Sequence, residues 1–325
     1  MLSLSAVRTL ALALPSFVLP TIEDLSELSE LGRIASGDEP ILAITANLKR
    51  VYIEATRGER KVDVPELYPS DFRGLGDRGL RSMADYYVSP QVKKRIMVEW
   101  REIGIDEQGT GRSVVENRIR QLAHLLRTPK SFDFRTLTCL GLVHFPQDDR
   151  YGFVFDLPST VVDPDALPVT LFELLNLRNN PPPALGARII LAQKIASALC
   201  LLHASGWLHR GLRPHNILFF DKSFNPNDPT SITSPYIAGF GYALPDDAEE
   251  VPRPFMRISN PEYDMYRHPS VRDRFHETRY EQKHDIYSLG VILYEIGVWG
   301  SVTRQFDKYN TAISDFDDQL LKECE

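Results

Sequence analysis

The chain has 325 residues, of which 43% are hydrophobic and 25% are charged, a balance typical of a globular protein of one large domain or two lobes. Its net charge of -7 disfavours nucleic acid and anionic membrane as main partners, because both repel an acidic surface. Three widely spaced cysteines without a CxxC pattern indicate neither a zinc site nor a disulfide framework, and we expect a reducing, cytoplasmic location.

The first 20 residues are mostly apolar and are interrupted by Pro15. A secretory signal peptide is one interpretation of this run. The run is short and lacks a small-x-small cleavage site, which favours a buried or partner-facing helix instead. No later stretch has the roughly 18 unbroken apolar residues that a membrane-spanning helix needs, so we predict no membrane span.

Residues 22–56 carry acidic and apolar residues at helical spacing, which predicts two amphipathic helices with a turn near 36–40. We interpret residues 1–65 as an N-terminal helical extension. Residues 66–158 contain short strand-like runs and a helix over about 113–127, a pattern that indicates a small β-rich lobe.

Helices dominate the remainder, residues 159–325, which we interpret as a second and larger lobe. One long helix near 187–203 has a broad apolar stripe formed by Leu191, Ile195, Ala198, Leu199 and Leu202. Residues 285–299 are apolar on nearly every side, which predicts a helix buried inside this lobe. The sequence therefore predicts an α+β fold of two lobes, joined by the segment FDLPS at 155–159.

Four motifs in the second half follow one another in the order found in protein kinases. They are GWLHRGLRPHNILFF at 206–220, IAGFGYA at 237–243, YRHPS at 266–270 and KHDIYSLGVILYEIG at 283–297. With the preceding β-rich lobe, they resemble the protein kinase superfamily from about Phe72 to Gly300. Their spelling is most similar to kinase-like domains of filamentous fungi, which often follow a prion-inhibition (HeLo) domain. The resemblance implies a bilobal fold, here shortened at its C-terminal end, and a role in signalling.

The motif HRGLRPHN departs from the family pattern HRDxxxxN at its most important position. Gly211 stands where an aspartate orients the acceptor hydroxyl, and it has no side chain to accept a proton. The resemblance places Asn216 at a magnesium position and Arg213 where a lysine contacts the transferred phosphate. His209 and Arg210 complete the remnant of the loop.

The second missing acid belongs to the DFG motif, where Gly239 precedes Phe240. Glycine has no carboxylate for Mg²⁺, so we expect weak magnesium binding or none, and no other metal site. His209 and Phe240 match the family's internal hydrophobic spine, and Asp285 matches the buried aspartate that holds the catalytic loop. The chain thus keeps scaffold residues and lacks chemical ones, which predicts a catalytically impaired pseudokinase that regulates or scaffolds protein partners.

ATP remains a candidate ligand. The pattern GxGxxG at 74–79 either covers phosphates or forms a glycine-rich hairpin turn. Depending on whether VEWR or IMVE aligns with VAIK, Arg101 or Glu99 takes the phosphate-clamping position, and both share one strand face. The candidate nucleotide-binding residues are Gly74, Gly76, Gly79, Glu99, Arg101, Glu116 on the following helix, and Asp156 in the joining segment.

Two enzymatic alternatives remain open. In an atypical active protein kinase, which phosphorylates Ser, Thr or Tyr of a protein substrate with ATP, Asp221 or Asp246 would replace the missing acids in space. In a small-molecule kinase of the aminoglycoside or choline type, the loop aspartate is equally necessary, so Gly211 counts against it. A helical interaction protein with accidental motifs is disfavoured, because accidental matches would not follow this order.

Overall fold

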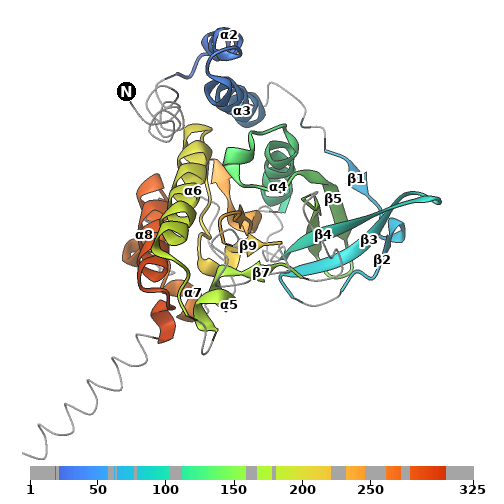
Figure 1. The fold of residues 1–325 in the computed structure, drawn as a ribbon. Helices are drawn as coiled ribbons and strands as arrows, with labels where there is room; N and C mark the ends of the chain where they lie inside the picture. The colour runs from blue at the N-terminus through green and yellow to red at the C-terminus, as the bar shows by residue number, and fades with distance from the viewer. Residues whose placement is uncertain are drawn as a thin grey trace, which may run out of the picture.

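The computed structural model describes residues 19, 22–57, 62, 64–76, 79–102, 112–158, 167–177, 181–220, 232–245, 261–271 and 279–304. These residues form a mixed α+β structure, with a curled six-stranded sheet on one side and a group of helices on the other (Figure 1). The predicted fold class, a bilobal kinase-like arrangement, is confirmed. The division at residues 65 and 158 stays a prediction, and so does the helix expected within the first 20 residues, of which only residue 19 is described.

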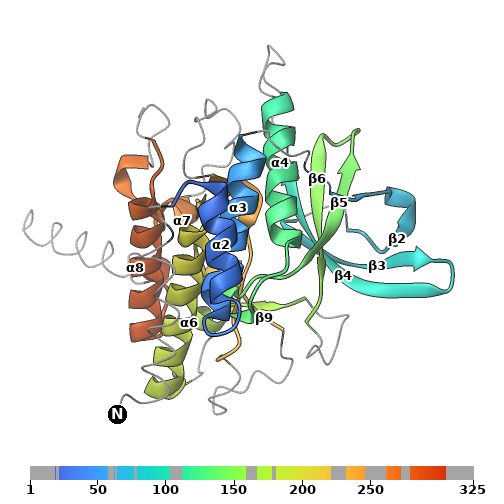
Figure 2. The same cartoon turned by 90° about the horizontal axis from the view of Figure 1, so that it is seen from above.

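Two helices precede the sheet, as the spacing of residues 22–56 predicts. They are α2 (Leu25–Ala35) and α3 (Pro40–Thr56), and Asp24 caps the first by accepting hydrogen bonds from two backbone N–H groups. Figure 2 shows α3 between α4 (Arg112–Arg127) and α6 (Leu185–Ala204), and it packs against both.

The contact between α3 and the helical half centres on an aromatic pair. The ring of Tyr52 meets that of Trp207 edge to face, with 6.0 Å between their centroids. Gly206 has a positive φ of 86°, and a Cβ built on it would lie 2.7 Å from the Tyr52 ring. Glycine is therefore required here for both its backbone conformation and its lack of volume.

The six strands of the sheet follow the order β1-β5-β6-β4-β3-β2. Only the β1–β5 pair is parallel among these described strands, and α4 packs against β5. The strands are β1 (Glu66–Leu67), β2 (Phe72–Arg73), β3 (Arg81–Ser89), β4 (Val92–Glu102), β5 (Cys139–Phe145) and β6 (Arg150–Asp156). The strands and the helix predicted for this region are confirmed.

The helical half contains four helices and short strand pairs in its described part. The helices are α5 (Leu171–Asn176), α6, α7 (Pro261–Asp264) and α8 (Gln282–Val298), and the strands are β7 (Val169–Thr170), β8 (Trp207–Leu208), β9 (Ile217–Phe219), β10 (Tyr236–Ile237) and β11 (Leu244–Pro245). The reciprocal capping box of Thr170 and Glu173 fixes the start of α5. Strands β9 and β10 pair antiparallel and lead into the candidate site.

Helix α6 buries the stripe that its sequence predicts, including Leu191, Ile195 and Leu199. It is also long and apolar enough to span a membrane by length and composition, with a mean hydropathy of 1.6. In the structure it packs against α3, α8 and β8, as a core helix does.

Helix α8 differs from its prediction on one side. Its buried face includes Asp285, Ile292 and Ile296, but Ile286, Tyr294 and Val298 are about half exposed. The apolar sequence predicted burial all round, and this is wrong for that face, because no layer of described residues covers it.

The end of α8 contains a buried acid whose protonation is linked to folding. The Oε1 atom of Glu295 accepts hydrogen bonds from the Tyr266 hydroxyl and the Val302 amide, each at 2.8 Å. Burial raises the pKa of this carboxyl to about 7, against an ordinary value of 4.5. The native state therefore keeps a proton that the unfolded chain releases. The associated stability is fully present below pH 4.5 and is lost as the pH rises through about 7.

Glu295→Gln should consequently be more stable than the wild type at pH 8, by about 3 kcal/mol, and the difference should shrink towards pH 5. Urea unfolding at several pH values between 5 and 8 measures this. Glu281→Gln is the matched control, because a hydrogen bond from Lys283 holds the pKa of that exposed carboxyl below its ordinary value. A difference that stays constant across the pH range would contradict the linkage.

Candidate functional site

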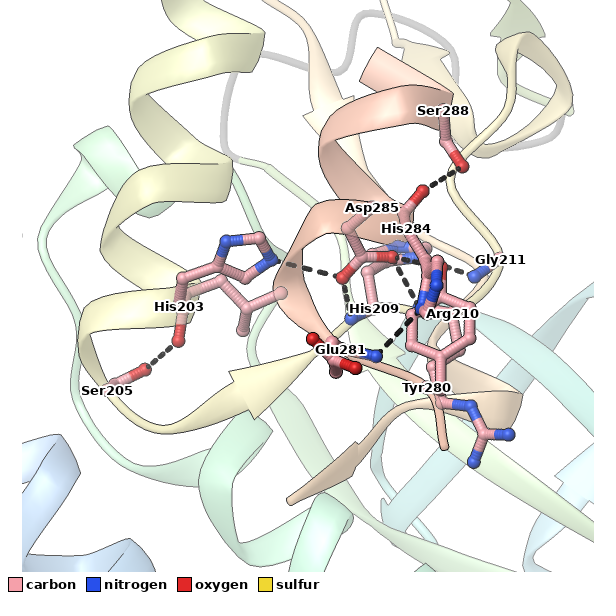
Figure 3. A network of polar contacts seen from close by, with 11 residues as sticks. His203, Ser205, His209, Arg210, Gly211, Tyr280, Glu281, His284, Asp285 and Ser288 are labelled. Carbon is pink, nitrogen blue, oxygen red and sulfur yellow. Dashed lines mark hydrogen bonds and ion pairs between the residues drawn. The ribbon is translucent and has the colours of Figure 1, made fainter. Parts of the chain in front are cut away.

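One carboxylate on α8, that of Asp285, holds the first residues of the loop at 209–216 (Figure 3). Asp285 is fully buried and accepts hydrogen bonds from the backbone N–H groups of His209 at 2.7 Å and Arg210 at 2.9 Å. It also accepts from the Tyr280 hydroxyl at 2.7 Å and contacts the His203 ring at 3.0 Å. Burial alone would raise the pKa of Asp285, but the His203 and Tyr280 contacts hold it below the ordinary value.

His209 connects this loop to the segment that contains Gly239. Burial lowers the pKa of His209 to about 4, so the ring is neutral at pH 7. Its Nε2 lies 3.0 Å from the Ala238 carbonyl oxygen and therefore donates, while Nδ1 accepts from the Gly211 amide at 3.3 Å. The ring also packs on Phe240, with 4.7 Å between centroids. The predicted scaffold residues thus lie in contact.

The two arginines of the loop pack on tyrosines. Arg210 has a left-handed backbone with φ of 60°, and its guanidinium lies 5.0 Å from the centre of the Tyr280 ring. The Arg213 guanidinium lies 3.8 Å from the centre of the Tyr263 ring and is largely buried. Cation–π contacts of this kind hold a guanidinium in one orientation.

The Asn216 side chain occupies the space that a side chain at position 239 would need. A Cβ built on Gly239 would lie 2.1 Å from Asn216 Nδ2, and the φ of Gly239 is 82°. Asn216 Nδ2 donates to the Gly211 carbonyl at 2.6 Å, which fixes it there. A Cβ on Gly211, in contrast, meets its nearest atom at 3.4 Å, the Gly239 carbonyl oxygen. In this packing, the Asn216 side chain therefore leaves no room for an aspartate at position 239.

Arg81 reaches from the sheet into this loop. It begins β3, directly opposite Glu99 on β4, and its Nη2 atom lies 3.2 Å from Glu99 Oε1. The same nitrogen donates to Asn216 Oδ1 at 2.7 Å, and Nη1 donates to the His215 carbonyl at 2.9 Å. The side chains of Arg81 and Glu99 are only 11% and 8% exposed. A buried guanidinium therefore joins the two halves of the protein across the cleft.

Our reasoning from the sequence missed Arg81, although a signal was present. In the kinase pattern GxGxxGxV, a valine stands two residues after the third glycine, and in this chain that position is Arg81. An arginine at the start of a strand usually keeps its charged group in water, so the sequence predicted no contact for Arg81. Its burial against Glu99 shows that both belong to the cleft.

The structure brings six of the fifteen sequence-predicted site residues together around one small cavity. Its volume is about 90 Å³, and it is lined by Gly79, Leu80, Arg81, Glu99, Trp100, Arg101, Arg213, Asn216, Gly239 and Gly241. Glu99 and Arg101, the two alternatives for the residue that would contact phosphates, thus both line the cavity. Gly74 and Gly79 have positive φ, and Gly76 lies against Ser82.

Glu116 and Asp156 take part in ion pairs elsewhere. Glu116 pairs with Arg112 on its own helix at 3.0 Å, and Asp156 pairs with Lys94 at 2.7 Å. Their predicted part in nucleotide binding stays a prediction.

The donor atoms around Asn216 do not fit a magnesium ion. Mg²⁺ is held in proteins by carboxylate oxygens, and glycine occupies both acid positions here. The remaining amide oxygen already accepts from Arg81, whose positive charge repels a cation. Within the described ranges, no three His, Cys, Asp or Glu residues are grouped to hold a metal. Asp221 and Asp246, the acids of the active alternative, lie outside the described residues.

Comparisons with curated proteins find several kinases, whereas no protein-family model matches the chain. The chain is 34% identical to human serine/threonine-protein kinase ULK1 over 106 residues. This aligned segment makes up 33% of this chain and 9% of the human protein. It is 30% identical over 131 residues to a serine/threonine-protein kinase-like protein of Arabidopsis thaliana, and this segment makes up 39% of this chain and 32% of the plant protein. A protein of Plasmodium falciparum named "Probable serine/threonine-protein kinase 2" is 35% identical over 126 residues, and this segment makes up 39% of this chain and 21% of that protein. The chain thus matches a third or less of the length of each of these relatives.

Proposed function

We propose that this chain, which is related to the protein kinase superfamily, does not transfer phosphate and works as a regulatory or scaffolding protein. One observation carries the proposal. The Asn216 oxygen that would bind a metal accepts from the Arg81 guanidinium, between two positions where glycine replaces the catalytic acids.

The chemistry of phosphoryl transfer explains why this observation matters. Catalysis depends on positioning the phosphates, neutralising their charge with metal, and orienting the acceptor hydroxyl. Gly211 offers no group for the acceptor, and Glu99, the carboxylate that lines the cavity with Asn216 in the described part of the chain, is already paired with Arg81. The two losses affect separate parts of one transition state, so their effects on rate multiply.

The retained scaffold supports a binding role. Four donors satisfy Asp285, and His209 and Phe240 remain packed together, so the loop keeps a fixed shape without catalytic groups. A buried carboxylate is costly unless such partners satisfy it. A fixed loop surface of this kind suits recognition of a protein partner.

The full chain incubated with radiolabelled ATP, Mg²⁺ or Mn²⁺ and a generic protein substrate should show no transfer above a sample without protein. The missing acceptor group alone is expected to lower the rate by about 10²- to 10⁴-fold. An active protein kinase assayed in parallel is the positive control. Transfer by the wild type that disappears in Asp221→Ala or Asp246→Ala would establish the active alternative and overturn the proposal.

A further inference from the structure

Helix α8 presents an apolar side to solvent in the described part of the chain. Between positions 286 and 298, Glu295 is the one residue with an acidic or basic side chain, and that side chain is buried. The large apolar side chains on the exposed side are each about half exposed, and they are Ile286, Tyr294 and Val298. Because a helix this apolar is ordinarily covered on every side, this face is suited to a second apolar surface.

Two glycines lie on the same side of α8, seven residues apart. Gly290 and Gly297 are exposed, and a Cβ built on either would have no atom within 4 Å among the described residues outside the helix itself. Neither has a positive φ, and glycine weakens a helix compared with alanine. The packing of the described residues therefore gives no reason for glycine here. A second helix along this face would give one, because it can approach the backbone closely where side chains are absent.

The sequence that follows α8 contains an amphipathic pattern of matching length. Residues 305–325 lie outside the described residues, and their sequence contains neither proline nor glycine. Apolar residues recur there at alternating spacings of three and four, which is typical of a helix that packs along another, and they are Phe306, Tyr309, Ile313, Phe316 and Leu320. In a helix this stripe would span about 21 Å, and the face from position 286 to 298 spans about 18 Å.

The chain leaves α8 at a point from which the stripe can reach this face. The Val302 amide donates to Glu295 Oε1 at 2.8 Å, which holds the chain at the end of α8. Phe306 follows four residues later and can therefore lie within about 14 Å of Val302. The stripe would then meet Val298 first and run antiparallel to α8, towards Ile286.

We propose that residues 306–320 form a helix that docks antiparallel on the exposed face of α8. With Phe306 beside Val298, Gly290 lies opposite Ile313. Burial of apolar side chains from both helices stabilises the contact. The inference goes beyond the proposed function and does not depend on it, because it concerns the exposed side of α8, whereas the loop is held by Asp285 on the buried side.

Disulfide formation in the full chain tests this docking. In a background of Cys200→Ser and Cys324→Ser, mild oxidation of Gly290→Cys with Ile313→Cys should form an intramolecular disulfide, seen as a mobility shift on a non-reducing gel. The matched control combines Gly290→Cys with Asp315→Cys, which lies on the polar side of the same turn. The first pair should cross-link at least about tenfold faster than the control, because a disulfide needs Cα atoms within about 7 Å of each other.

Substitutions on either side of the contact should slow the cross-link between positions 290 and 313. Phe316→Ser on the segment and Ile286→Ser on α8 each remove an apolar side chain, and each should slow it by about threefold or more. Asp318→Ser, on the polar side of the segment, should leave the rate unchanged. Circular dichroism of the reduced variants shows whether they are folded.

A second pair of positions keeps the test decisive if Gly290→Cys does not fold. Gly297→Cys combined with Phe306→Cys should then cross-link faster than Gly297→Cys combined with Lys308→Cys, for the same geometric reason.

Equal rates for Ile313→Cys and Asp315→Cys would overturn the inference. Disulfide-linked dimers whose yield rises with protein concentration would also overturn it, and would indicate that a second copy of the chain covers α8. Neither result bears on phosphate transfer, which the radiolabel assay measures separately.

Discussion

Replacing Asp285 with alanine is expected to destabilise the protein by about 3–5 kcal/mol, the typical cost of breaking a buried charged network by removing one member. Four donors would lose their acceptor at once: the amides of His209 and Arg210, the Tyr280 hydroxyl and the His203 ring. Buried donors that lack a partner keep their full desolvation cost. Urea unfolding at pH 7 measures the loss.

Two controls give this prediction its specificity. Asp285→Asn keeps the shape and one carbonyl acceptor, so it should cost clearly less than Asp285→Ala. Asp264→Ala removes a partly exposed carboxylate that pairs with Arg267 at 3.0 Å, and it should cost under about 1 kcal/mol. If Asp285→Ala cost no more than Asp264→Ala, the network would not be what holds the loop.

Gly239→Ala should cost about 3 kcal/mol, whereas Gly211→Ala should cost under about 1 kcal/mol. Gly239 has a φ of 82°, and an added Cβ would lie 2.1 Å from Asn216 Nδ2. Both the backbone strain and the overlap with Asn216 therefore oppose the change. At Gly211 the nearest atom to an added Cβ is 3.4 Å away, so only a small adjustment is needed.

A double-mutant cycle isolates the overlap with Asn216. In the background Asn216→Ala, Gly239→Ala should cost about 1–2 kcal/mol less than it does alone, because the opposing side chain is gone and only backbone strain remains. The same measurement on Gly211→Ala should show little coupling. Equal costs of Gly239→Ala in both backgrounds would mean that Asn216 does not occupy the position of the missing acid.

The order of the elements could be predicted from hydrophobic periodicity because each depends mainly on local pattern. The stripe of α6 and the two helices of residues 22–56 were found in this way. Helix α8 shows the limit of that reasoning. An apolar sequence indicates what a helix could bury but does not show what lies against it, and Ile286 and Tyr294 are exposed in the described part of the structure.

The motif at 209–216 assigned a position to each loop residue, and the structure places Gly211 and Asn216 in contact, whereas their predicted roles stay predictions. Arg81 was not predicted, since its partner Asn216 lies 135 residues away and no local pattern records that contact. Glu116 illustrates a further difficulty. Its helix was predicted correctly, and its pairing with Arg112 follows from the spacing of four residues. Whether Glu116 faces the cleft depends instead on how the helix packs against the sheet, which no local pattern records.

Helix α3 touches α4 beside the sheet and α6 in the helical half, and its Tyr52 fits against Trp207 and Gly206. It therefore bridges the sheet-containing lobe and the helical lobe. A rotation of one lobe against the other would require α3 to break its contacts with α4 or with α6. Any change in the contacts of α3 would therefore reach both lobes at once.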